Sequence, residues 1–219
     1  EVVPQGSVLR LAYGAIRGVL SDPATRRIFA VFGVAFLASQ MSRPYLPVLV
    51  ERLNPDGRNL ASDIALVAGT AALAGALVSP LGGAIGDRIG FRPVLTAALL
   101  GGGVALVVTP FVTSIPLLAL TALVFAALYA AVSAMVFGLL ALEIPPERRS
   151  TTLNLVYLPL YAAGIVGPAA GAAVVSVGLG APFVAGGAIL VIACVVMALR
   201  WRGGGRAPYA GRAEGVSPL

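Results

Sequence analysis

Long apolar segments alternate with short polar or proline-containing breaks along this chain. Each segment is long enough to cross a bilayer as a helix, because about 20 residues at a rise of about 1.5 Å span its roughly 30 Å hydrocarbon core. Strands of a membrane barrel would be about half that length and would alternate apolar with polar positions. The pattern therefore predicts an all-α integral membrane protein with six transmembrane helices. The six segments are 29–50, 62–85, 92–112, 115–142, 151–178 and 182–201.

The segments also predict how the chain is organised. A weakly amphipathic stretch over 8–20 is expected to form a cytoplasmic surface helix that leads into the first span. Ser21, Asp22 and Pro23 then have the pattern of a helix N-cap followed by a proline in the first turn. The tail is rich in Gly, Pro, Arg and Ala and is expected to be disordered. The three parts are a leader over 1–28, a transmembrane domain over 29–201 and a tail over 202–219.

Composition supports lipid as the solvent of this chain. Hydrophobic residues make up 58% of the 219 positions and charged residues 11%, whereas soluble domains average about 45–50% and 25%. Cys194 is the single cysteine and histidine is absent, which excludes a disulfide framework, a zinc cluster and histidine-based catalysis. No catalytic set and no nucleotide loop is recognisable. We therefore expect neither an enzyme nor a cofactor.

All fifteen basic residues are arginine, and their distribution predicts the orientation. If the N-terminus is cytoplasmic, twelve of them lie on the cytoplasmic side of the membrane. Loops rich in arginine usually stay in the cytoplasm, so this orientation is the expected one. The opposite side keeps Arg52 and Arg58, while Arg43 lies in or near the first segment. The arginines flank apolar runs instead of forming a basic face, so we expect no nucleic-acid partner. The prediction is a multi-pass plasma-membrane protein with both termini in the cytoplasm.

The connection between the second and third segments carries the most specific motif. Its residues Gly83, Asp87, Arg88, Gly90 and Arg92 resemble the G-x-x-x-D-R-x-G-R-R/K loop of the major facilitator superfamily. The family motif ends in two basic residues, and this chain has Phe91 in place of the first of them. A tight turn needs the positive φ that glycine accepts, and the carboxylate at position 87 is suited to accept hydrogen bonds from a helix N-terminus or to pair with an arginine. The resemblance implies a cytoplasmic gating loop that latches one state of a transport cycle, whereas an unrelated six-helix protein would use it as an ordinary positive loop.

A second motif lies on the fifth segment and before it. The run over 145–150 followed by Gly164, Gly167, Pro168 and Gly171 is similar to the P-E-R-R and G-P-x-x-G pattern of drug-exporting members of that superfamily. Glycines three and four residues apart form a flat strip on which another helix packs closely. The proline removes a backbone donor and is expected to bend the helix. A generic close helix contact is the alternative interpretation.

The resemblance also implies a partner for this chain. Members of the superfamily usually have twelve helices, built as two six-helix halves. The leader resembles the long central connection of such proteins, and the fourth segment lacks the arginine that the N-terminal half often carries. We therefore expect the C-terminal half of a twelve-helix bundle, with an N-terminal six-helix half as its partner; the start at Glu1 instead of methionine agrees. A self-contained six-helix homodimer or scaffold without transport activity is the alternative.

Polar residues inside the apolar segments are the candidates for substrate binding, because each is costly there unless it faces a cavity or a partner. Gln40 and Arg43 precede Pro44 and Pro47, which should break the regular helix. Arg43 is suited to bind an anionic group, to pair with a carboxylate of the other half, or to extend to the outer surface.

Aromatic residues supply further candidates. Asn154, Tyr157 and Tyr161 share one face of the fifth segment, and Tyr129 pairs with Ser133 on the fourth. Such side chains suit a broad pocket for lipophilic molecules, although packing or an interfacial aromatic belt explains them equally well.

No acidic residue lies in the middle of a segment. Asp63 is expected to cap the second helix, and Glu143 to be a solvated charge at the end of the fourth. The resemblance implies a secondary active transporter that works by alternating access within the lipid bilayer, and we expect it to export a small lipophilic or drug-like substrate. Proton coupling is implied as well, with the titrating carboxylate in the partner half. A sugar or organic-anion porter of the same superfamily is the alternative.

Overall fold

The computed structural model describes residues 17, 21–144 and 152–202, and this part of the chain contains helices and turns but no strand. The predicted all-α membrane fold is confirmed. The predicted surface helix over 8–20, the run over 145–150 and the tail lie wholly or almost wholly outside the described residues. The elements are α2 (Pro23–Ser42), η1 (Arg43–Tyr45), α3 (Leu46–Leu53), α4 (Leu60–Ile89), α5 (Phe91–Val108), η2 (Thr109–Phe111), α6 (Ile115–Glu143), α8 (Tyr157–Val175) and α9 (Ala181–Arg202).

Five of the described helices are long and apolar enough to cross a membrane. Helix α4 has 30 residues and α5 has 18, so the bundle combines long and short helices. The first predicted segment differs from the others, because the regular helix stops at Ser42 and passes through the 3₁₀ turn η1 before α3 begins. Pro44 and Pro47 have no N–H group and cannot continue the helical hydrogen bonding. The predicted break at these prolines is confirmed.

Helix α2 begins six residues before the predicted apolar boundary, because a polar cap defines its start. The carboxylate of Asp22 accepts hydrogen bonds from the backbone nitrogen of Thr25 at 2.9 Å and from its hydroxyl at 2.5 Å. Pro23 occupies the first helical position, where a missing N–H costs nothing. The predicted cap is confirmed, and the added turn places Arg26 and Arg27 at this end of the bundle.

The predicted cap at Asp63 is wrong. Helix α4 begins at Leu60, after Asn59 in a left-handed conformation with φ 57°. The Asp63 carboxylate instead accepts a hydrogen bond of 2.7 Å from the amide of Asn54, whose nitrogen also donates to the Arg58 carbonyl at 2.6 Å. The acidic side chain therefore ties the connecting loop to the first turn of α4.

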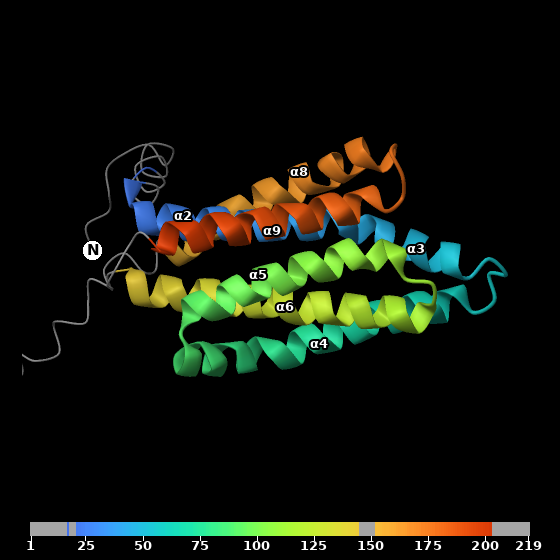
Figure 1. Cartoon of the computed structure of the whole chain (residues 1–219), viewed down its shortest axis with the longest axis horizontal. Helices are drawn as coiled ribbons and strands as arrows, with labels where there is room; N and C mark the ends of the chain where they lie inside the picture. Colours follow the sequence, from blue (N-terminus) through green and yellow to red (C-terminus); the bar gives the residue numbers. More distant parts are fainter. Residues whose placement is uncertain (1–16, 18–20, 145–151, 203–219) are drawn as a thin grey trace, which may run out of the picture.

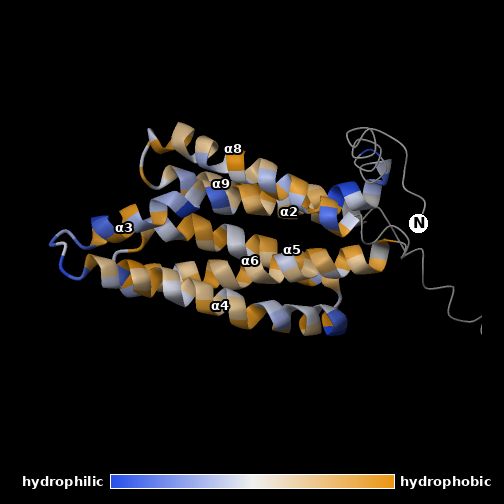
Figure 2. Cartoon of the chain, turned by 180° about the vertical axis from the view of Figure 1, so that it is seen from behind, coloured by the Kyte–Doolittle hydropathy of each residue, from blue (hydrophilic) through white to orange (hydrophobic). Residues whose placement is uncertain are grey.

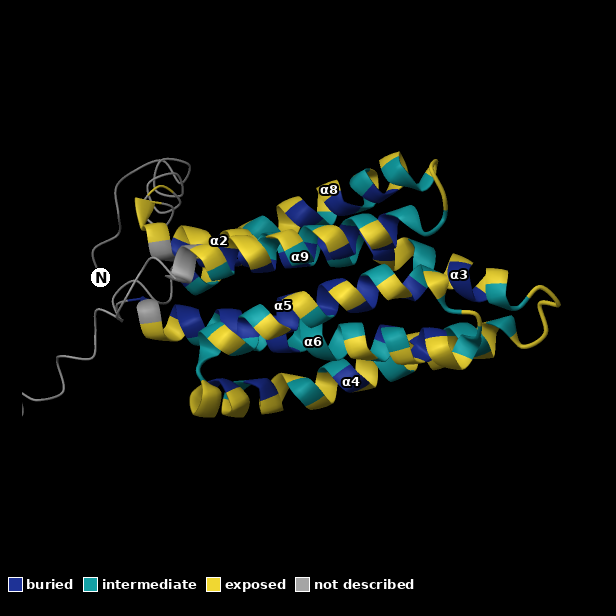
Figure 3. Cartoon of the chain, viewed as in Figure 1, coloured by how far each residue is buried: buried dark blue, intermediate teal, exposed yellow. Residues whose placement is uncertain are grey.

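The helices form two groups that meet along a seam. Helix α2 packs mainly on α8 and α9, α6 packs mainly on α4 and α5, and the two groups are joined chiefly by α5 against α9 and by α2 against α6. Helices α4 and α8 form opposite margins of the bundle in Figure 1. Their exposed faces carry large apolar side chains such as Leu73, Leu77 and Ile165 (Figure 3). These faces suit contact with lipid or with another membrane segment.

Glycines bring the helices to backbone contact. An added Cβ at Gly103 would lie 2.9 Å from the carbonyl oxygen of Gly187, and one at Gly187 would lie 2.5 Å from the carbonyl oxygen of Gly103. Helix α9 also contacts α2 in this way, because an added Cβ at Gly186 of α9 would lie 2.9 Å from the carbonyl oxygen of Ala38 on α2. Small residues serve this purpose in membranes, because lipid gives helices no hydrophobic drive to associate. Close packing at glycine therefore sets the arrangement of α2, α5 and α9.

Hydrophilic residues gather at the two ends of the bundle (Figure 2). One end holds the start of α2 and the turn between α4 and α5, and the opposite end holds the loop between α3 and α4. We call these the arginine-rich end and the opposite end. The apolar layer between them fits the thickness of a bilayer core.

Replacing Gly187 by alanine is expected to lower the stability of the bundle by about 1–3 kcal/mol, because overpacking forces the backbones apart. The new methyl group would lie 3.0 Å from the Val107 backbone nitrogen as well as close to Gly103. Thermal unfolding of the detergent-purified protein measures this as a lower midpoint. Gly69→Ala is the control, because nothing lies within 4 Å of an added Cβ there. Its midpoint should stay equal or rise slightly, and equal midpoints for both variants would contradict the described contact.

Candidate functional site

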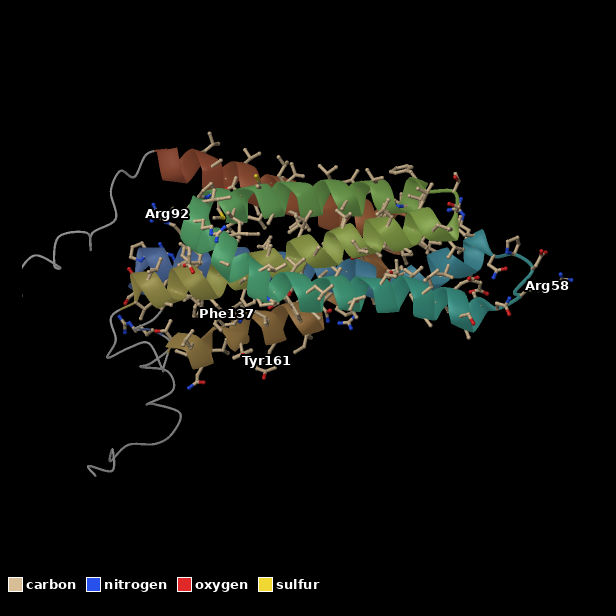
Figure 4. The ribbon with its side chains drawn as sticks, turned by 90° about the horizontal axis from the view of Figure 1, so that it is seen from below. Arg58, Arg92, Phe137 and Tyr161 are labelled. Atoms are coloured by element: carbon tan, nitrogen blue, oxygen red, sulfur yellow. The ribbon has the colours of Figure 1, made fainter. Side chains whose placement is uncertain are left out.

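The turn between α4 and α5 holds the predicted gating loop at the arginine-rich end. Gly90 alone joins the two helices, with φ 99°, and its N–H donates to the Gly86 carbonyl at 2.8 Å. A side chain would strain this conformation, so the predicted requirement for glycine is met. Asp87 and Arg88 are exposed and Arg92 is half-buried. In Figure 4, Arg92 lies at the opposite end of the bundle from Arg58.

The pairing of Asp87 with Arg92 does not occur in the structure. The Asp87 side chain makes no hydrogen bond or ion pair with any residue that the structure describes. Gly90 turns the chain between the two residues, so they belong to different helices. Gly83 is equally open, with nothing within 4 Å of an added Cβ. This edge of α4 is therefore available to a partner from outside the described residues.

Phe91 fills a niche between α4 and α6. An added Cβ at Gly86 would lie 2.7 Å from two ring carbons of Phe91 and 3.0 Å from the Met135 methyl group, and an added Cβ at Gly138 would overlap the same ring. The ring packs against the buried core. The sequence marks Phe91 only as a departure from the family motif, because the niche needs Gly138 from a helix far along the chain. The ring fixes the turn to α6 by apolar contact.

Gln40 and Arg43 lie where α2 passes into η1, and Tyr129 lies at the middle of α6. Arg43 is exposed, whereas Tyr129 is half-buried. The Ser133 hydroxyl donates to the Tyr129 carbonyl at 3.2 Å. The side-chain oxygen of Gln40 is buried and has no hydrogen-bond partner among the described residues, a situation that costs about 1–3 kcal/mol.

Aromatic rings continue the α2–α6 seam on both sides of this group. Phe32 of α2 meets Phe137 of α6 edge to face, with ring centroids 5.7 Å apart. Phe125 lies beside Tyr129 at 6.1 Å. The sequence does not single out these phenylalanines, since isolated aromatics in apolar helices carry no periodic signal. The seam therefore combines aromatic surface with a few polar groups.

Asn154, Tyr157 and Tyr161 do not join this seam. All three are exposed, and Tyr161 keeps 70% of its surface accessible. Figure 4 shows Tyr161 pointing away from the bundle. Helix α8 packs mainly on α2 and less on α9, and makes little contact with α6. These residues and Tyr129 thus occupy two separate surfaces of the described structure.

The glycine strip of α8 faces α2. An added Cβ at Gly167 would lie 2.6 Å from the Cβ of Gln40, and one at Gly171 would lie 2.5 Å from the Met41 carbonyl oxygen. Gly164 is less crowded, at 3.7 Å from the Phe36 ring. Pro168 lies inside the helix beside this strip. A further proline, at position 159, explains why the regular helix starts at Tyr157 although the candidate span runs from Thr152.

Within the part of the chain that the structure describes, no group of three or more His, Cys, Asp or Glu side chains could hold a metal ion. The polar groups of the seam are neutral apart from Arg43. Side chains of this kind are suited to bind and orient a ligand.

The contact between Phe91 and Gly138 is testable by a double-mutant cycle. Gly138→Ala is expected to lower the unfolding midpoint, since the methyl group collides with the ring. Phe91→Leu should also destabilise, because it removes packed surface. In the double variant, leucine leaves room for the new methyl group. We therefore expect the double variant to lose about 1 kcal/mol or more less stability than the sum of the two single losses. Strictly additive losses would contradict the niche.

A comparison of the whole chain with protein families points to the same family as the motif in the loop between α4 and α5. The family model described as Major Facilitator Superfamily matches residues 28–216. A search of curated proteins gave no match. The matched region includes every described transmembrane helix except the first turn of α2, and it contains the Gly83 to Arg92 motif. The chain therefore belongs to the major facilitator superfamily.

Proposed function

We propose that this membrane transporter forms the C-terminal six-helix half of a secondary active carrier that exports small lipophilic or drug-like compounds by alternating access. The observation that carries the proposal is the α2–α6 seam. There the rings of Phe32 and Phe137 meet edge to face, and Phe125 lies beside Tyr129. The side-chain oxygen of Gln40 is buried without a hydrogen-bond partner among the described residues. Polar groups of this kind at membrane depth are expected along a substrate path.

The packing supports motion of this six-helix half as one body, because glycine contacts also join α5 to α9 across the two helix groups. Glycine contacts hold α2 to α8 and α9, and the Phe91 ring holds the gating loop to α6. Closely packed groups rock as rigid bodies more readily than they deform. In the proposed cycle, the Asp87 carboxylate latches the arginine-rich end by contacting the partner half. Its exposure and open surroundings support this role.

We also propose the orientation of the transporter in the membrane, the direction of transport and the coupling ion. The arginines at one end of the bundle support a cytoplasmic location for that end, in a plasma membrane. The G-P-x-x-G pattern of α8 supports export, and we propose proton coupling through a carboxylate of the partner half. The exposed face with Asn154, Tyr157 and Tyr161 is then a second candidate surface for substrate or for that partner.

A transport assay tests the proposal. The full-length protein in proteoliposomes is expected to move labelled lipophilic compounds when a pH gradient is imposed, and a protonophore should abolish the movement. The measurement is accumulation relative to protein-free vesicles. Equal accumulation in both kinds of vesicle, across a panel of compounds and gradients, would refute transport.

Asp87→Asn is expected to slow transport by roughly tenfold while membrane insertion stays normal, because a neutral amide loses the charge-assisted bonds of a latch. Initial transport rates at equal protein incorporation measure the effect. Asp56→Asn is the matched control, since this exposed carboxylate lies in the loop between α3 and α4 at the opposite end. A rate for Asp87→Asn equal to the control's rate would rule out the latch.

A further inference from the structure

The opposite end of the bundle has two kinds of connection between its helices. The loop between α3 and α4 is charged and hydrophilic (Figure 2). The connections over 109–114 and 176–180, which we call the apolar rim, carry no charge. They expose large apolar side chains instead, since Phe111 keeps 70% of its surface accessible and Val177 keeps 87%. Apolar surface exposed to this extent is unfavourable in water.

The two parts of the apolar rim lie side by side. An added Cβ at Gly180 would lie 2.8 Å from the Cβ of Pro110. Pro110 belongs to η2, and Gly180 directly precedes α9. In each part another apolar residue, Val112 or Leu179, packs against the core of the bundle. The rim is therefore one packed structure with its own outward apolar surface.

Helix lengths place the rim at the boundary of the hydrocarbon core. Arginine is costly inside the core, so Arg92 at the start of α5 and Arg200 near the end of α9 mark the boundary at the arginine-rich end. Phe111 follows Arg92 by 19 positions, and Gly180 precedes Arg200 by 20. At about 1.5 Å per residue, both separations are close to the core thickness of about 30 Å. Any tilt of these helices brings the rim deeper into the lipid.

The loop between α3 and α4 lies farther out than the rim. Helix α4 begins at Leu60 and reaches Arg88 after 28 positions, which is a rise of about 42 Å. The loop that precedes α4 therefore extends about 12 Å beyond a core of about 30 Å. Figure 1 shows it projecting past the other two connections at this end. The opposite end is thus stepped, with a charged hairpin in the water and a lower, uncharged rim.

The hydroxyl groups of the rim are compatible with a position in lipid. The Thr109 hydroxyl donates to the Ala105 carbonyl at 2.7 Å, and the Ser176 hydroxyl donates to the Ala173 carbonyl at 3.3 Å. Polar groups are costly outside water when they lack a hydrogen-bond partner. Both of these hydroxyls have one inside the protein.

We propose that the apolar rim is immersed in the membrane interface, where Phe111 and Val177 contact the phospholipids of the leaflet at this end. The boundary between headgroups and acyl chains accepts apolar side chains to a depth of about 5–10 Å. The rim then anchors one side of the bundle in lipid, while the hairpin between α3 and α4 stays in water. The inference needs only a bundle that spans the membrane, so it is independent of the substrate and of the direction of transport.

Spin labelling of the full-length protein in phosphatidylcholine vesicles tests the immersion. A nitroxide is attached to the new cysteine of Phe111→Cys or Val177→Cys, with Cys194→Ser and any other cysteine of the protein replaced as well. Collision of the label with oxygen, which concentrates in lipid, is compared with collision with a nickel chelate, which stays in water. We expect both labels to collide several-fold more with oxygen than with the chelate. Preferred collision with the chelate at the two positions would overturn the proposal.

The label in Asp56→Cys is the matched control, because this exposed residue lies in the hairpin loop at the same end. It should collide mainly with the nickel chelate. Little collision with either reagent at positions 111 and 177 would mean that protein covers the rim, as a partner or a second copy would, and would also overturn the proposal. If Phe111→Cys does not fold, Val177→Cys carries the test, because a side chain that is 87% accessible contributes little to packing.

Discussion

Backbone contact at glycine is the interaction on which this bundle depends. Inside a bilayer the helices satisfy their own hydrogen bonds, and the surrounding lipid is as apolar as their side chains. Cohesion must then come from close packing, which Gly103 and Gly187 provide between α5 and α9 and Gly171 provides between α8 and α2. The leucine-covered outer faces contribute little to holding the helices together. They determine instead that the protein stays in lipid.

The sequence predicts elements whose cause is local. Segment lengths follow from bilayer thickness, the cap at Asp22 follows from its spacing to Thr25, and the turn at Gly90 follows from the motif. Asp63 was misassigned because its partner, Asn54, belongs to a loop whose path the sequence does not reveal. The interruption at η1 was visible as two prolines, although its conversion into a 3₁₀ turn was not.

The candidate site was only partly predictable for a related reason. Periodicity places Asn154, Tyr157 and Tyr161 on one helix face, but it does not say which neighbour covers that face. The structure packs α8 on α2 through Gly167 and Gly171, and the three residues remain exposed. Phe91 and Gly138 are 47 positions apart, so their contact arises from the packing of α5 on α6.

The unequal helix lengths have a consequence for the membrane itself. Helix α4 spans 30 residues and α5 only 18, yet one residue joins them. At about 1.5 Å per residue they are about 45 Å and 27 Å long, against a core of about 30 Å. Such a pair cannot match one acyl thickness without tilt or local deformation of the lipid. Bilayer thickness therefore bears differently on α4 and on α5, and the two helices meet at the single residue Gly90.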